Sequence, residues 1–155
     1  MTTIEYTITD SANDGISAVD NSLFETGTSY YGNVWAIGWN HFFRFPSVTI
    51  PVGATITAAY VSIRGGGVPM GSLSNIYLKI FAEKAESAPV APTSCSEFNT
   101  KAGSVTTAYV TWTPDAWVDG TYYNSPELKT IIQELVDTYS HASGRTIQIF
   151  ILDNG

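Results

Sequence analysis

The chain has few charges, because only 14% of its 155 residues are Asp, Glu, Lys or Arg. Seven basic residues against fourteen acidic ones give a formal net charge of −7. Proteins that bind nucleic acid or anionic membranes depend on clustered Lys and Arg side chains. The composition therefore predicts neither a nucleic-acid partner nor a membrane partner, and an acidic surface poor in lysine suits exposure outside a cell.

The chain also lacks paired cysteines and long apolar runs. Cys95 is the single cysteine, which excludes an intramolecular disulfide and a cysteine-based zinc cluster. No apolar run reaches transmembrane length, and the first residues lack the basic and apolar segments of a signal peptide. We therefore expect a protein used in the cytoplasm, assembled into a particle there, or excised from a larger protein.

No catalytic motif stands out. The chain has no Gly-x-Ser-x-Gly, no His-Glu-x-x-His and no phosphate-binding loop. A glycosidase needs two facing carboxylates, and residues such as Glu83 and Asp115 supply only the pairs that any acidic protein offers. His41 lies in an aromatic stretch that indicates a structural histidine, and His141 lies at the end of a predicted helix. We predict that the protein is not an enzyme.

Strand patterns, by contrast, recur along the whole chain. Residues 44–65 read as two strands joined by a turn at 51–53, where Pro and Gly favour turn conformations. Apolar residues alternate with others over 4–8, 76–82 and 147–151, as in half-buried strands. Short strands separated by Gly and Pro turns predict a single mainly β domain over 1–155, a jelly-roll-like antiparallel β-sandwich.

One amphipathic α-helix is predicted over about 125–141. Ser125 is a suitable N-cap, Pro126 suits the first turn, and Glu127 complements the helix dipole. Apolar residues then recur at helical spacing in one stripe, from Leu128 to Tyr139. Residues 86–103, rich in Pro and Ser, are predicted to form a long irregular connection.

The end of the sequence predicts an incomplete hairpin. Asn154-Gly155 is a strong turn signal, and a hairpin without its second strand leaves unpaired backbone groups. We expect either that the domain lacks its last strand here, or that another chain supplies a strand.

The block Arg44 to Tyr60 resembles a recurring segment of bacterial and phage extracellular β-sandwich domains. These are similar to carbohydrate-binding modules and to the modules called DNRLRE domains. The resemblance continues through residues 76–83, 110–117 and 123–128 and the helix that follows, and it covers the chain roughly from Asp10 to the end. It implies a non-catalytic display, adhesion or carbohydrate-binding role.

Two aromatic groups are candidate sugar-stacking sites, since aromatic rings pack on the apolar faces of sugar rings. Tyr30 and Tyr31 lie in a predicted loop near Trp35 and Trp39, and Tyr122 and Tyr123 precede the predicted helix. The alternative is that the aromatic residues of 33–45, with Trp112 and Trp117, fill the core.

A calcium site is a further candidate, since Ca²⁺ prefers clustered oxygen ligands. The loop over 10–21 carries four of them: Asp10, Asn13, Asp14 and Asp20. The alternative is that they serve as turn residues. No other cofactor is predicted.

We therefore predict a non-catalytic structural or adhesion module, foremost a virion surface protein such as a capsid decoration, fibre or tail appendage. Its partner would be a protein lattice or a homo-oligomer. The alternative is a carbohydrate-binding module of a secreted bacterial protein with a polysaccharide partner. Both place the protein on a virion surface or outside the cell.

Overall fold

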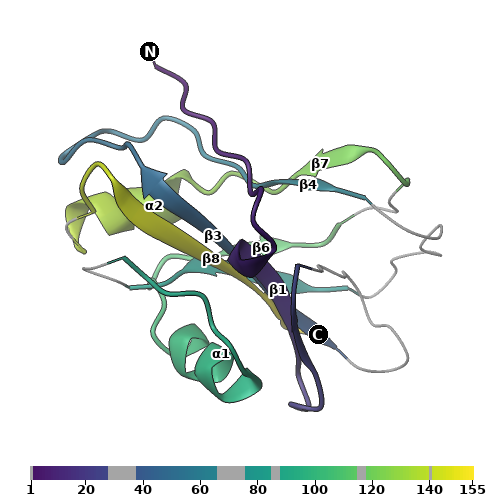
Figure 1. Cartoon of the computed structure of the whole chain (residues 1–155). Helices are drawn as coiled ribbons and strands as arrows, with labels where there is room; N and C mark the ends of the chain where they lie inside the picture. Colours follow the sequence, from purple (N-terminus) through teal and green to yellow (C-terminus); the bar gives the residue numbers. More distant parts are fainter. Residues whose placement is uncertain (1, 28–37, 66–75, 85–87, 115–117, 140) are drawn as a thin grey trace.

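Most of the regular structure is antiparallel β-sheet, as Figure 1 shows for the computed structural model of the chain. The structure describes residues 2–27, 38–65, 76–84, 88–114, 118–139 and 141–155. The elements follow one another as η1 (Ser11–Asn13), β1 (Asp14–Ala18), β2 (Phe24–Thr26), β3 (Trp39–Val48), β4 (Ser62–Arg64), β5 (Leu78–Ala82), α1 (Cys95–Ala102), β6 (Val110–Trp112), β7 (Tyr122–Asn124), α2 (Lys129–Asp137) and β8 (Arg145–Asp153).

The main sheet has six strands in the order β2-β1-β3-β8-β5-β6, and β4 pairs with β7 in a second, two-stranded sheet. The last strand, β8, lies between β3 and β5, with Ile151 opposite His41 on one side and Ile80 on the other. β8 itself is therefore paired on both sides, and the missing last strand that the sequence indicated stays a prediction.

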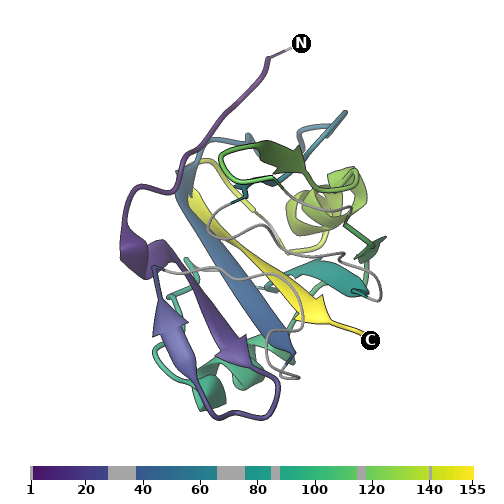
Figure 2. The same cartoon turned by 90° about the vertical axis from the view of Figure 1, so that its right-hand side faces the viewer.

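The main sheet has two faces of different character, because successive side chains of a strand point to opposite sides. On its inner face, Leu78, Ile80 and Ala82 of β5 are buried in one core with Ile131 and Leu135 of α2. The outer face carries the other set of side chains and is partly covered by α1. In Figures 1 and 2, α1 lies on one side of the main sheet, and α2 lies with β4 and β7 on the other.

The predicted fold class, a mainly β antiparallel sandwich with an amphipathic helix, is confirmed. The predicted strand over 4–8 is not a strand in the structure, although Tyr6 Oη contacts Thr49 Oγ1 at 2.7 Å. Of the second of the two strands predicted within 44–65, only β4 has ladder pairing.

The helix begins later and ends earlier than the predicted 125–141. Ser125 does not cap it, because its Oγ accepts a hydrogen bond from Val61 N at 3.1 Å and donates one to the Pro126 carbonyl at 2.8 Å. Leu128 N donates to the Ala59 carbonyl at 2.8 Å, which keeps residues 125–128 alongside 59–61. Leu128, the first residue of the apolar stripe, therefore lies beside residues 59–61, and the rest of the stripe starts in α2.

A second helix, α1, lies within the predicted irregular connection. Ser94 caps it by accepting a hydrogen bond from Glu97 N at 3.2 Å, and the Glu97 carboxylate accepts from Thr93 N at 2.8 Å. Phe98 is its one buried residue, at 0% exposure. The Phe98 ring packs edge-on against Phe150 at 5.1 Å between centroids, which fixes α1 on the outer face.

Candidate functional site

The tyrosines proposed for sugar stacking are separated by the structure. Tyr30 and Tyr31 lie outside the described residues. Tyr122 and Tyr123 are neighbours on β7, so their side chains point to opposite faces. Tyr122 is 67% exposed, whereas Tyr123 packs against the core and its Oη accepts a hydrogen bond from Val118 N at 2.9 Å. On β7, only Tyr122 presents its ring openly to solvent.

The residues proposed for calcium fall into two places. Asp10 precedes η1, Asn13 ends it and Asp14 begins β1, whereas Asp20 follows the other end of that five-residue strand. Three of the side chains accept hydrogen bonds from other residues of the protein. Asp10 Oδ1 accepts from Ala12 N at 3.0 Å, Asn13 Oδ1 from Arg44 at 2.6 Å, and Asp20 Oδ1 from Ser22 N at 2.9 Å. The bonds to Ser22 hold the pKa of Asp20 below its usual range.

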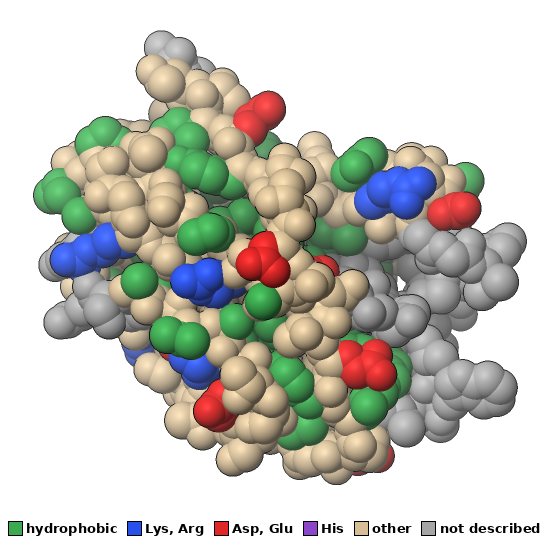
Figure 3. All heavy atoms as spheres, viewed as in Figure 1, with side chains coloured by type: hydrophobic (Ala, Val, Ile, Leu, Met, Phe, Trp, Pro, Cys, Tyr) green, Lys and Arg blue, Asp and Glu red, His purple; other side chains and the backbone are tan. Residues whose placement is uncertain are grey.

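Within the described parts of the chain, no three His, Cys, Asp or Glu side chains are grouped so as to hold a metal ion. Neither described helix has the length and apolar character that crossing a membrane requires. On the face drawn in Figure 3, acidic and basic side chains are scattered singly among polar and hydrophobic ones. Calcium binding stays a prediction, and a fall in melting temperature on chelation is its test.

Both histidines are buried. His41, on β3, is fully buried, and burial lowers its pKa to about 3. His141 is 4% exposed, and burial followed by the charge of Arg145 lowers its pKa. Both imidazoles are therefore held in the neutral form inside the fold, away from solvent.

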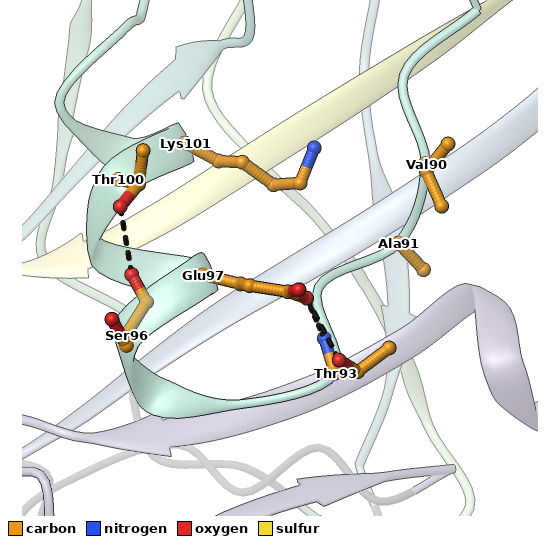
Figure 4. Close-up of a pocket in the computed structure, with 7 residues that line it drawn as sticks. All are labelled: Val90, Ala91, Thr93, Ser96, Glu97, Thr100 and Lys101. Carbon is orange, nitrogen blue, oxygen red and sulfur yellow. Dashed lines mark hydrogen bonds between the residues drawn. The ribbon is translucent and has the colours of Figure 1, made fainter.

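A groove of about 320 Å³ runs between α1 and the segment that precedes it (Figure 4). Its polar side chains largely satisfy one another. Glu97 accepts from Thr93, which lowers the pKa of Glu97, and Lys101 Nζ lies 3.4 Å from Glu83 Oε1. Burial raises the pKa of Glu83 even though Lys101 and Gln148 favour its charged form. The paired polar groups leave the groove few free contacts for a ligand.

The outer face of the main sheet is left uncovered at β5 and β6, and its exposed side chains there are mainly aromatic. We call Tyr77, Lys79, Phe81 and Tyr109 the β5–β6 aromatic face. Tyr77 is 50% exposed and Tyr109 is 52% exposed. The rings of Phe81 and Tyr109 lie 5.6 Å apart at an interplanar angle of 39°. Lys79 Nζ lies 5.1 Å from the centre of the Tyr109 ring.

The register of the sheet brings these four side chains together. Lys79 and Phe81 are alternate residues of β5, and Tyr77 immediately precedes the strand on the same side. The Tyr77 carbonyl accepts from Asn154 N at 2.8 Å, so the contact with the β8 segment continues there. Since Ile80 pairs with Val110, Tyr109 comes to lie beside Phe81 across the strands.

β5, the strand beneath this face, is fixed by a buried inner side and by a paired strand on each edge. On its inner side Leu78 is 3% exposed, and Ile80 and Ala82 are fully buried. β5 also has a hydrogen-bonded neighbour on each side, β8 and β6. Phe81 is thus carried by a packed strand, and Tyr77 and Tyr109 directly precede β5 and β6, which limits the entropy cost of ordering these rings around a ligand.

Comparisons of the chain with protein-family models, with curated proteins and with solved structures gave no match. What the geometry defines is therefore a class only: a β-sandwich that offers an exposed aromatic surface on a sheet. The resemblance to carbohydrate-binding and DNRLRE modules stays a prediction.

Sequence reasoning identified the amphipathic strand over 76–82 but not the site on it. The signal was in the residues that alternate with the apolar ones, because Tyr77 and Phe81 are aromatic where a solvent-facing strand position is commonly polar. Tyr109 carried no such signal alone. Its place beside Phe81 depends on the pairing of β5 with β6 across about 30 residues of sequence, a non-local contact.

Proposed function

We propose that the protein is a non-catalytic adhesion module that binds a polysaccharide through the β5–β6 aromatic face. The observation that carries this proposal is the pair of half-exposed tyrosines, Tyr77 and Tyr109, which directly precede β5 and β6 and lie on the same side of the sheet as Phe81. Flat aromatic rings on a sheet fit the apolar faces of successive sugar units, and tyrosine hydroxyls suit a half-wet site. The role is compatible with either predicted setting, a virion surface or a secreted protein.

A pull-down on insoluble polysaccharides, followed by titration with soluble fragments of the retained one, tests the proposal. Loss of one stacked ring costs about 0.5–1.5 kcal/mol, so Tyr109→Ala should weaken binding by up to roughly tenfold. A Tyr77→Ala and Tyr109→Ala double variant should no longer be retained.

The matched control is Tyr122→Ala, which removes a tyrosine of the second sheet that is more exposed than Tyr77 and Tyr109. It should bind as the unchanged protein does. Loss of retention in this variant, with the double variant unaffected, would contradict the proposal and move the binding surface to β7.

Assembly into a virion lattice or homo-oligomer is the other role predicted from the sequence. The main sheet ends in β2 and β6, which are only three residues long. Short edge strands are a common protection against strand-to-strand association. The edges therefore favour a module that binds a ligand on its face, and sedimentation at low micromolar concentration tests the lattice role, which requires an oligomer.

A further inference from the structure

We propose that the polysaccharide bound by the β5–β6 aromatic face is an acidic one, whose carboxylates are recognised by Lys79. This inference rests on the proposed function, since it names the chemical class of the ligand at the same surface. It depends on where this lysine lies, on what it contacts, and on the charge of the rest of the protein.

Lys79 lies within the aromatic surface and not at its rim. It is the middle member of the series Tyr77, Lys79 and Phe81 on one side of β5, and its residue pairs with Thr111 across the strands. Its ammonium group is held 5.1 Å from the Tyr109 ring centre. A sugar ring stacked on Tyr109 would therefore bring its substituents close to a positive charge.

Lys79 has no acidic partner among the described residues. The ion pair that the structure does show among them joins Lys101 to Glu83, at 3.4 Å. Lys79 instead has the ring of Tyr109, an interaction of about 0.5–1 kcal/mol at exposed sites. Because none of the carboxylates that the structure describes neutralises its charge, it is available for a carboxylate of a ligand.

The net negative charge of the protein distinguishes recognition by Lys79 from general attraction of a polyanion. Seven basic residues face fourteen acidic ones, so a polyanion would be weakly repelled at long range. Lys79, which pairs with no described carboxylate, places a positive charge inside the stacking surface, where it can bind a negative group of the ligand at one fixed position. Recognition should then depend on carboxylates carried by the sugar units that stack, and not on the total charge of the polymer.

The test uses alginate, polygalacturonate and hyaluronate, each beside its carboxyl-reduced form, in which neutral sugars replace the uronates. We expect the unchanged protein to bind at least one acidic polymer about fivefold more tightly than its reduced form, as for a favourable, partly exposed ion pair. Lys79→Gln should remove this difference and keep the binding to the reduced form.

Lys84→Gln is the matched control, because it changes the net charge equally and because Lys84 Nζ also lies near a tyrosine ring, 5.8 Å from Tyr139. It should keep the preference for the acidic polymer. Equal binding of acidic and reduced polymers by the unchanged protein, or equal effects of the two lysine variants, would overturn the inference alone. Retention that survives the Tyr77 and Tyr109 double variant would overturn the proposed function as well.

Discussion

The outer face of the main sheet has two halves with similar residues and different surroundings. Under α1, Phe42 of β3 and Phe150 of β8 are fully buried, with the Phe98 ring packed against both. Beyond α1, at β5 and β6, Phe81 and Tyr109 lie in contact with each other but are not covered by a helix. The same sheet thus carries a closed aromatic cluster and an open one.

The covered half of the face serves the stability of the fold, whereas the open half is free to bind a ligand. Burial of a phenylalanine contributes about 1.5–3 kcal/mol, so the closed cluster holds α1 and the sheet together. An open aromatic cluster gains little of this free energy in the unbound protein. Exposed aromatic surface that is not needed for folding commonly marks an interaction site.

The largest effect should come from removing the ring that closes the covered half. Phe98→Ala should lower the free energy of unfolding by about 3–5 kcal/mol, because it leaves a cavity between α1, Phe42 and Phe150. Phe81→Ala, on the open half of the same face, should cost less, about 1–2 kcal/mol, because Phe81 is only partly buried. Urea denaturation of the two variants measures both values, and equal losses would end the distinction between the halves.

Lowering the pH should reduce the free energy of unfolding through His41 on the inner face, by less than Phe98→Ala does. His41 lies between Ile16 and Ile151 across the strands, and burial lowers its pKa from 6.5 to about 3. Below pH 6.5 the unfolded chain therefore takes up a proton that the folded protein does not. Stability from this residue is complete above pH 6.5 and falls by about 1.4 kcal/mol per pH unit toward pH 3.

Denaturation at pH 7 and pH 5 should accordingly show a loss of about 2 kcal/mol from His41, and the lowered pKa of His141 adds in the same direction. A His41→Gln variant is the comparison, and it should lose less between the two pH values. Parallel losses in the two proteins would show that His41 is not the group responsible.

The smallest effect should come from the open half itself. A Tyr77→Ser and Tyr109→Ser double variant should change the free energy of unfolding by less than about 0.5 kcal/mol per site, because both rings are half exposed. Thermal melting without ligand measures this change. If each single variant lowered the melting temperature by several degrees, these rings would stabilise the fold. That outcome would contradict a binding role for the open half.

Local patterns predicted much of this fold. Alternation over 76–82 and 147–151 gave β5 and β8, and the apolar stripe gave α2, since these elements bury one face and carry the periodicity in their own residues. α1 was missed because it buries a single residue, Phe98, and so shows no periodicity. Its capping signal, Ser94 followed by Glu97, was present in the sequence.

The candidate site was harder to predict, since it is assembled from strands that are distant in sequence. Ser125 shows the same limit, because its hydrogen bond to Val61 spans 64 residues and replaces the helix cap that its neighbours suggested. The sequence proposed Tyr122 and Tyr123 together for sugar stacking. The structure exposes Tyr122, whereas Tyr123 points to the opposite face of the β4–β7 sheet.

The central place of β8 has a consequence for how the protein is made. β8 joins the β2-β1-β3 group to the β5-β6 group, and none of the other strands that the structure describes pairs across that gap. A growing chain on the ribosome therefore holds two unconnected sheet fragments until Arg145 to Asp153 emerge and insert between them. Such late, long-range pairing is slow. During synthesis, the facing edges of β3 and β5 are the surfaces that a chaperone would need to shield.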